Sequence, residues 1–405
     1  MKKDAILTII FRGISASLNL LIGVLTARML GSEGRGIFAI VFNILTLILL
    51  FGNMGLSVSN IYFISNDSHN ENKVISVSFY FSLFVGVIFA VLGFVLLKTE
   101  LPSMVGYDIY SKYIFIILVI VPFALVNKNL ITVFQAKQEF IKFNLYSITQ
   151  NFMFVLLFAI GYFFYSQFKL LQLSFYILDI SYFTAFILVV YLLFGKIKIS
   201  QFDFNFLKKS LSFGLKGYIA NINGFLNYRA DLFILAIYKE PAEVGIYSIS
   251  VVVAESLLLI SESLSIVLAP KVGRSKGIEG RELTNKVLYY NFLILTFLSF
   301  IIAVTGYWLI PVVFGNEYLT SFYSSLILLP GIIVIGLASN LASYFIGVGN
   351  TSIFMTASTL SLISNIVMDF LFIPKYGMYG AATASTISYF VSFLYGYMVY
   401  LKYKE

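Results

Sequence analysis

What the sequence lacks narrows its class first. It has no cysteine and a single histidine among 405 residues, which excludes disulfide bonds, thiolate metal sites and histidine-rich metal centres. Charged residues make up only 11% of the chain, whereas a soluble domain has about one quarter. The sequence also has no HExxH motif, Walker A loop or nucleophile elbow. We therefore expect no catalytic residues and no metal site.

The sequence is rich in hydrophobic residues. They form 60% of the chain, and the aromatics, at 18%, include 42 Phe and 28 Tyr, which suits a lipid-facing surface with interfacial tyrosines. At about 20 apolar residues per span, the sequence predicts an all-α integral membrane protein with twelve transmembrane helices. Their expected ranges are 5–27, 37–64, 75–97, 113–136, 142–165, 170–194, 210–237, 244–268, 286–311, 320–346, 352–373 and 378–401.

The chain divides into two similar halves. The pentapeptide GIFAI at 36–40 has a counterpart, GIYSI, at 245–249, and each follows a short charged turn and opens a long apolar run. The polar break at 196–209 separates six predicted helices from six. We predict an N-terminal lobe at 1–196, a cytoplasmic linker at 197–209 and a C-terminal lobe at 210–405.

Basic residues orient the chain in the membrane. Most loop lysines and arginines fall on the side that also carries both termini, so we predict cytoplasmic termini. The net charge of +8 is explained by such loops and does not require nucleic acid as a partner.

Four basic residues fall at membrane depth, where exposure to lipid costs roughly 2.5 kcal/mol or more, so they should face protein or water. Two of them head polar stripes at helical spacing, Arg12 with Asn19 and Lys216 with Asn223. Cations in such a place suit an anionic ligand, and phosphate is the leading candidate. The predicted substrate-binding residues are Arg12, Asn19, Lys128, Lys216, Asn223 and Arg229.

Acidic residues within the predicted spans have two possible roles. They are either partners for the basic residues or protonatable groups that couple transport to a proton or sodium gradient, and the sequence leaves both open. Arg229 and Asp231 could equally pair with each other. The plainer alternative for single Ser, Thr and Asn residues is an interhelical hydrogen bond. The ion-coupling candidates are Asp179, Glu255, Glu262 and Asp369.

Three stretches carry a family resemblance. They are TARMLGSEGRGIFAIVFNI (Thr26–Ile44), NYRADLFILAIYKEPAEVGIYSIS (Asn227–Ser250) and NIVMDFLFIPKYGMYGAATASTISYF (Asn365–Phe390). With the twelve-span count, they resemble the polysaccharide transporter branch of the multidrug/oligosaccharidyl-lipid/polysaccharide (MOP) flippase superfamily, the Wzx-type O-antigen flippases.

The resemblance implies two six-helix lobes, related as parallel repeats around a central cavity, that work by alternating access. It implies a flippase rather than an enzyme, located in the inner or plasma membrane. The implied substrate is an undecaprenyl-pyrophosphate-linked oligosaccharide repeat unit, moved to the outer leaflet for O-antigen or capsule synthesis. The implied partners are membrane lipids, a polysaccharide polymerase and a chain-length regulator, and no cofactor is expected.

Two alternatives remain. A cation-coupled drug or metabolite exporter of the same superfamily is disfavoured because the first helix carries Arg12 and no carboxylate after Asp4. A polyprenyl-dependent membrane glycosyltransferase or polymerase is disfavoured because no sizeable extramembrane loop is predicted. Relatives that flip the peptidoglycan precursor usually have two further helices, which are absent here.

Overall fold

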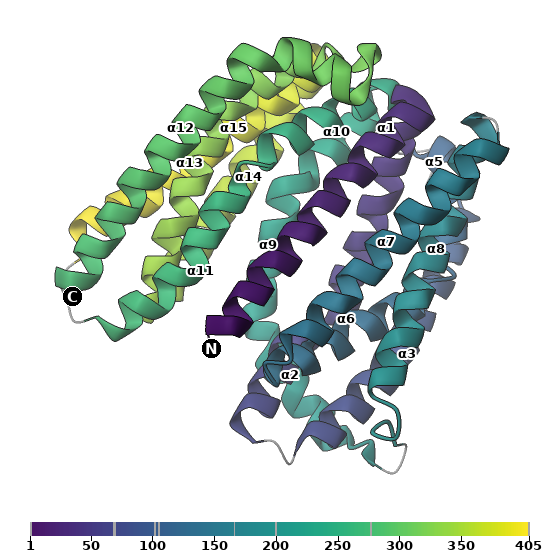
Figure 1. Cartoon of the computed structure of the whole chain (residues 1–405), viewed down its shortest axis with the longest axis vertical. Coiled ribbons are helices and arrows are strands. Elements are labelled where there is room, and N and C mark those ends of the chain that lie inside the picture. Colours follow the sequence, from purple (N-terminus) through teal and green to yellow (C-terminus); the bar gives the residue numbers. More distant parts are fainter. Residues whose placement is uncertain are drawn as a thin grey trace. The chain divides into compact units, whose positions relative to one another are not determined.

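The regular elements of the described chain are all helices (Figure 1). The structure, a computed structural model, describes residues 2–67, 70–100, 103, 106–165, 167–198, 201–275 and 278–403. The helices of the first half are α1 (Lys2–Asn53), α2 (Leu56–Asn66), α3 (Glu71–Leu97), α5 (Asp108–Ile117), α6 (Val121–Ala136), α7 (Phe140–Phe164) and α8 (Gln167–Leu192). Those of the second half are α9 (Phe204–Tyr238), α10 (Pro241–Glu255), α11 (Leu258–Arg274), α12 (Ile278–Phe314), η3 (Asn316–Tyr318), α13 (Ser321–Gly347), α14 (Thr351–Tyr376) and α15 (Met378–Lys402).

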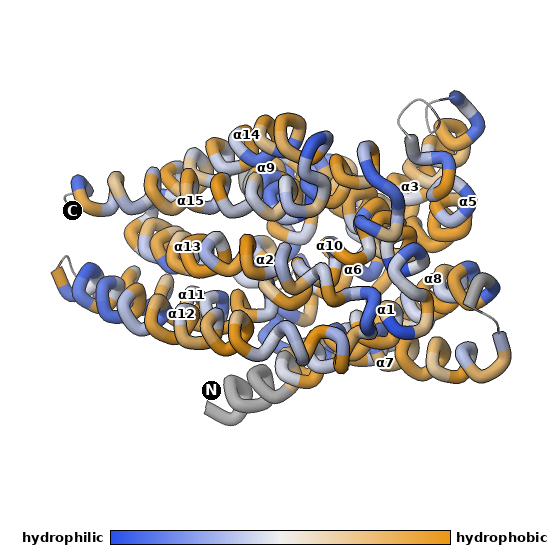
Figure 2. Tube along the Cα trace, turned by 90° about the horizontal axis from the view of Figure 1, so that it is seen from above, coloured by the Kyte–Doolittle hydropathy of each residue, from blue (hydrophilic) through white to orange (hydrophobic). Residues whose placement is uncertain are grey.

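Many of these helices can cross a membrane. Among the described residues, seven are long and apolar enough, and two bent pairs, α5–α6 and α10–α11, raise the number to nine. Figure 2 shows apolar residues along most of the length of such helices as α13. Helix α1 breaks at Gly31 (φ 71°), so that its two legs count as separate spans. Helices α9 and α15 have the length of a span but are less apolar than those counted above. These segments together account for the twelve predicted spans.

Three predicted helices are interrupted, which the apolar pattern did not reveal. The helix predicted over 37–64 breaks between α1 and α2, where Met54 (φ 47°) and Gly55 (φ 80°) take left-handed conformations. The helix predicted over 113–136 bends by 61° between α5 and α6, next to Pro122, which has no backbone N–H to donate. The helix predicted over 244–268 bends by 44° between α10 and α11.

The described chain forms two compact units. Unit 1 holds residues 1–30 and 37–222, and unit 2 holds 31–36 and 223–405. The boundary at 222/223 lies inside α9, and a short piece of α1 belongs to unit 2. The limits 1–196, 197–209 and 210–405 therefore stay a prediction about lobes in the membrane.

Each unit is built around one central helix. In unit 1, α6 packs against α2, α3 and α8, with residues such as Leu130, Phe134 and Val189 in the buried cluster. In unit 2, α13 packs against α10, α11, α12 and α15, and Leu341 and Tyr344 are among its buried side chains. Side chains on these two helices are positioned by close packing on several sides.

Candidate functional site

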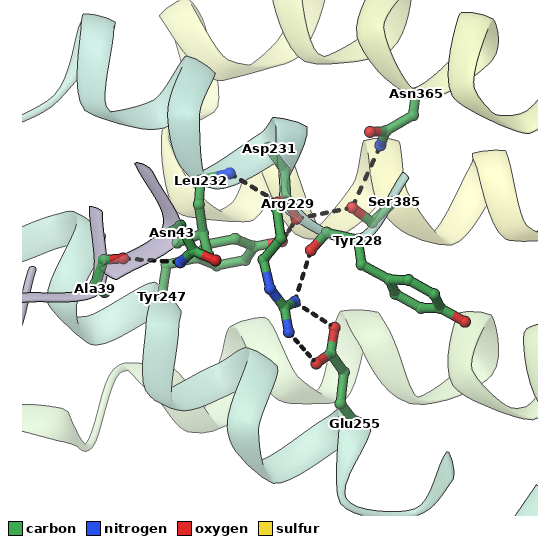
Figure 3. Close-up of polar contacts among 10 residues, drawn as sticks. All are labelled: Ala39, Asn43, Tyr228, Arg229, Asp231, Leu232, Tyr247, Glu255, Asn365 and Ser385. Carbon is green, nitrogen blue, oxygen red and sulfur yellow. Dashed lines mark hydrogen bonds and ion pairs between the residues drawn. The ribbon is translucent and has the colours of Figure 1, made fainter. Parts of the chain in front are cut away.

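An ion pair between α9 and α10 is the most sharply defined feature of unit 2 (Figure 3). The guanidinium of Arg229 donates to both carboxylate oxygens of Glu255, from Nη1 to Oε1 at 2.8 Å and from Nη2 to Oε2 at 3.0 Å. Nη1 also donates to the backbone carbonyl of Tyr228 at 2.7 Å. A predicted binding residue and a predicted ion-coupling residue thus form one bidentate pair, and Arg229 makes this pair with Glu255 rather than with Asp231.

Asp231 lies two residues from Arg229 and is deeply buried, with 3% of its surface exposed. Its Oδ2 accepts hydrogen bonds from the Tyr247 hydroxyl and, at 3.0 Å, from the Ser385 hydroxyl, while Oδ1 accepts one from the Leu232 amide at 2.7 Å. Helices α9, α10 and α15 meet at this carboxylate. Asp231 is not among the predicted site residues, although a carboxylate within an apolar run is the signal that marks such a residue.

Asp369 on α14 is fully buried, and neither of its carboxylate oxygens has a hydrogen-bond partner among the described residues. It interacts electrostatically with Asp231. One turn earlier, Asn365 donates to Ser385 at 3.4 Å and leaves its own carbonyl oxygen without a partner in the described part of the chain. Two carboxyl groups and an amide oxygen therefore gather in one buried place, where the described residues supply donors to Asp231 but none to Asp369.

Two hydrogen bonds join polar side chains of α9 to polar side chains of α14. Asn223 donates to the Thr359 hydroxyl at 2.9 Å, and the Ser361 hydroxyl donates to Asn227 at 3.1 Å. Both asparagines are buried. Asn223, predicted to bind substrate, therefore makes an interhelical hydrogen bond in this structure.

In unit 1, Lys128 lies on α6 between two fully buried asparagines, Asn127 and Asn129. Its side chain is half-buried, and its ammonium has no ion pair or hydrogen bond among the described residues. The neighbouring asparagines are paired: Asn127 donates to the Tyr182 carbonyl at 3.0 Å and Asn129 to the Ser82 hydroxyl at 2.7 Å. The amides of Asn127 and Asn129 thus lie in the packed interior, whereas the side chain of Lys128 is partly exposed.

Two further predicted residues of unit 1 lie on other helices than Lys128. Asn19 on α1 is exposed and accepts a hydrogen bond from Asn151 on α7 at 3.0 Å. Asp179 on α8 has a buried Oδ1 without a hydrogen-bond partner in the described chain.

The remaining predicted residues divide into two groups. Glu262 on α11 acts electrostatically on Tyr228, close to the Arg229–Glu255 pair. The side chains of Arg12 and Lys216 lie outside the described residues. The predicted residues whose side chains are described thus fall into two sets. Unit 2 holds Asn223, Arg229, Glu255, Glu262 and Asp369, and unit 1 holds Asn19, Lys128 and Asp179.

The chain is similar in sequence to proteins of polysaccharide biosynthesis. A family model described as "Polysaccharide biosynthesis protein" matches residues 25–323. The capsular polysaccharide biosynthesis protein CapF of Staphylococcus aureus is 30% identical over 146 residues, which are 35% of this chain and 37% of that protein. The aligned region thus spans little more than a third of that relative's length.

The solved structures match over nearly the whole chain. The lipid II flippase MurJ in an inward closed conformation has a TM-score of 0.79 at 18% identity, covering 98% of this chain and 88% of that one. An inward-facing multidrug resistance MATE family transporter of the MOP superfamily has a TM-score of 0.77 at 14% identity, covering 96% and 97%. A MOP superfamily transporter from Pyrococcus furiosus gives 0.62 at 14% identity, covering 96% and 93%. These similarities confirm the predicted fold class, an all-α membrane protein of twelve spans in two six-helix lobes.

Proposed function

We propose that this chain, which belongs to the family of polysaccharide biosynthesis proteins, is a flippase for an undecaprenyl-pyrophosphate-linked oligosaccharide. The family and the fold identify a multi-pass membrane transporter rather than an enzyme. The proposed reaction moves the repeat unit from the cytoplasmic to the outer leaflet of the inner or plasma membrane by alternating access. A relative named for capsular polysaccharide supports capsule synthesis as the pathway that uses the oligosaccharide. O-antigen synthesis is the alternative pathway for the same flippase reaction.

One observation carries the proposal: the ammonium of Lys128, which has no partner within the described chain. A lone cation at membrane depth is costly unless it meets water or an anion. The substrate proposed here carries a pyrophosphate, whose charge must also cross the membrane without entering hydrocarbon. Lys128 therefore serves as a phosphate-binding residue.

Other residues have supporting roles in this proposal. Arg229, held in a bidentate geometry, offers a second phosphate-binding group, and the exposed Asn19 offers an amide to sugar hydroxyls. Arg12 and Lys216 remain substrate-binding residues by sequence prediction. Asn223 contributes by holding α9 against α14.

Ion coupling is proposed for the carboxyl groups of unit 2. Asp231 and Asp369 are both buried, and Asp369 lacks hydrogen-bond donors among the described residues. Two neighbouring carboxylates cannot both stay charged in a medium of low dielectric constant unless a proton or a cation joins them. A proton or sodium gradient can act through this pair, and Asp179 is the corresponding candidate in unit 1.

The membrane orientation belongs to the same proposal. Both termini lie in the cytoplasm, as the basic loops predict. A polysaccharide polymerase and a chain-length regulator act next on the translocated unit.

Reconstituted vesicles test the function. Wild-type protein should translocate the lipid-linked oligosaccharide, and Lys128→Ala should slow this about ten- to a hundredfold, the loss expected for a hydrogen bond to a charged group. Lys128→Arg should retain part of the activity because it keeps the charge. The exposed Lys402→Ala is the matched control and should behave as wild type.

The proposal fails if wild-type vesicles do not translocate the lipid-linked sugar. It also fails if folded, thermally stable Lys128→Ala translocates at the wild-type rate. Efflux of a cationic dye that Lys128→Ala leaves intact would instead favour a drug exporter.

A further inference from the structure

The Arg229–Glu255 pair is more open than a buried structural salt bridge. Its side chains are 26% and 22% exposed, although Asp231, two residues away, is only 3% exposed. Both helices lie in a chain that spans the membrane, and charged groups are not left against hydrocarbon. The exposed side of the pair therefore meets water or a polar ligand.

Arg229 is held in place by more than Glu255. Its Nη1 donates to the Tyr228 carbonyl at 2.7 Å, and this carbonyl belongs to the backbone of α9. The guanidinium therefore keeps its position when the carboxylate leaves. The two donors that now bind the oxygens of Glu255 have the spacing that binds two oxygens of a phosphate group.

Glu255 lies at the end of a helix, next to a bend in the chain. It is the last residue of α10, and α11 begins at Leu258 after a bend of 44°. A small change in this bend moves the carboxylate relative to α9. Departure of the carboxylate alone would leave an uncompensated cation, which is strongly unfavourable within a protein. The carboxylate therefore leaves Arg229 only when another anion replaces it.

The groups around Glu255 are those that its carboxylate meets once it leaves Arg229. The charged and titratable groups around the pair come from three helices. Tyr228 and Asp231 of α9 and Tyr389 of α15 interact electrostatically with Arg229 or Glu255, and Glu262 of α11 interacts with Tyr228. Within this set Arg229 is the one cation. Once Arg229 binds another anion, the carboxylate faces phenols and other acids, and a proton is the group that stabilises it.

We propose that Arg229 and Glu255 form an anion-exchange switch (Figure 3). A phosphate group of the substrate displaces the Glu255 carboxylate from Arg229, and the released carboxylate takes up one proton from water. Binding of the anion is thereby linked to binding of a proton. This inference rests on the proposed function, because the phosphate-bearing substrate supplies the anion.

Anion binding to the purified full-length protein in lipid nanodiscs tests the switch. Sulfate is the probe, because it is tetrahedral and keeps its charge near neutral pH, so that any proton exchanged belongs to the protein. Calorimetric titration in two buffers of different ionisation enthalpy measures the protons taken up. Wild type should take up about one proton per sulfate bound at this site.

Three variants separate the roles. Glu255→Gln should bind sulfate more tightly, by about fivefold or more, and without proton uptake, because the competing carboxylate is gone. Arg229→Gln should lose the linked proton uptake and bind sulfate at least about tenfold more weakly. Glu139→Gln is the matched control, since Glu139 also pairs with basic residues, Lys137 and Lys142, but at the ends of α6 and α7, and it should match wild type. Thermal unfolding of each variant shows that it is folded.

Sulfate binding by wild type without proton uptake would overturn the switch. The switch would also be overturned if Glu255→Gln bound sulfate with the same affinity as wild type. It would be overturned too if neither wild type nor Glu255→Gln bound sulfate. None of these results touches the proposed function, which stands or falls on translocation of the lipid-linked sugar by wild-type vesicles.

Discussion

Gly36 and Gly245, the first residues of the two repeated pentapeptides, pack directly against each other within unit 2. A Cβ on Gly36 would lie 1.8 Å from the Pro241 carbonyl oxygen, and a Cβ on Gly245 would lie 1.9 Å from the Ser32 carbonyl oxygen. Neither position has room for a side chain, because the obstacle is backbone. Small residues allow membrane helices to approach so closely.

The contact anchors the piece of α1 that belongs to unit 2. Ser32 donates from its amide and its hydroxyl to Glu317 at 3.0 and 2.8 Å, and Arg35 Nε donates to the Ser248 hydroxyl at 3.1 Å. Residues 31–36 thus bind both α10 and η3. The repeat that marked two halves in the sequence also marks where the first half contributes to the second unit.

Gly245→Ala and Gly36→Ala should each destabilise the protein by about 1–3 kcal/mol, the usual penalty of overpacking. The measurement is the midpoint of thermal unfolding in detergent, taken as the temperature at which half of the protein is no longer monodisperse. Gly224→Ala on α9 is the control, because a Cβ there meets nothing within 4 Å. Midpoints of the two variants equal to that of Gly224→Ala would contradict the contact.

Each unit is joined internally by an asparagine with the same pattern of hydrogen bonds. In unit 1, Asn129 accepts from the Asn53 amide at 2.5 Å and donates to the Ser82 hydroxyl at 2.7 Å. In unit 2, Asn340 accepts from the Asn291 amide at 2.6 Å and donates to the Ser265 hydroxyl at 2.9 Å. Each of these two asparagines lies on the central helix of its unit, α6 or α13.

Asn129→Ala and Asn340→Ala should each lower stability by about 1–2 kcal/mol, because an amide partner is left buried without its hydrogen bond. Thermal unfolding in detergent measures the change. Thr305→Ala on α12, at a half-buried position whose hydroxyl donates to the Ile301 carbonyl of its own helix, should have no effect. Stability unchanged in both asparagine variants would show that these networks are not what holds the units together.

Asp203 makes the stability of unit 1 depend on pH. It accepts a hydrogen bond from the Phe206 amide at 3.0 Å and forms an ion pair with Lys73 at 3.0 Å. The Phe206 amide and then the Lys73 ammonium lower the pKa of Asp203 below its usual value. A carboxyl group with a lowered folded-state pKa adds stability above its unfolded pKa of about 3.9. That stability is lost as the pH falls through the folded pKa.

Asp203→Asn should therefore unfold at a lower temperature than wild type near neutral pH, and the two should converge in acid. Thermal unfolding across a pH series measures the difference. Glu282→Gln, an exposed change at the start of α12, controls for the loss of one carboxylate. A difference that stays constant as the pH falls would rule out this linkage.

The carboxyl pair of unit 2 should determine how transport responds to an ion gradient. Asp369→Asn and Asp231→Asn each remove one of the two acidic groups, so the remaining group no longer shares a proton or a cation. We expect each variant to lose the response of vesicle translocation to an imposed proton or sodium gradient. Ser385→Ala, which removes one donor to Asp231, should weaken the response without abolishing it. A full response in both amide variants would place the coupling elsewhere.

The sequence by itself determined the class, the number of spans and the residues that are costly at membrane depth. It did so because a membrane requires about 20 apolar residues per helix and penalises every charge within them, and both constraints act locally along the chain. The repeated pentapeptides that begin at Gly36 and Gly245 could also be recognised from the sequence, because they are a local pattern of residues. The sequence alone left open whether Arg229 pairs with Asp231 or with an acid on another helix.

Tertiary structure decided the partners and the breaks. Arg229 binds Glu255 because α9 and α10 lie side by side, and Asp231 turns to Tyr247 and Ser385 because two residues along a helix point to different faces. The bend between α10 and α11 lies next to Glu255 and Ser256 and has no proline, and both helices pack against α13. Which charges meet and which stay unpaired depends on contacts between helices that are far apart in the chain, and no periodicity within one helix contains that information.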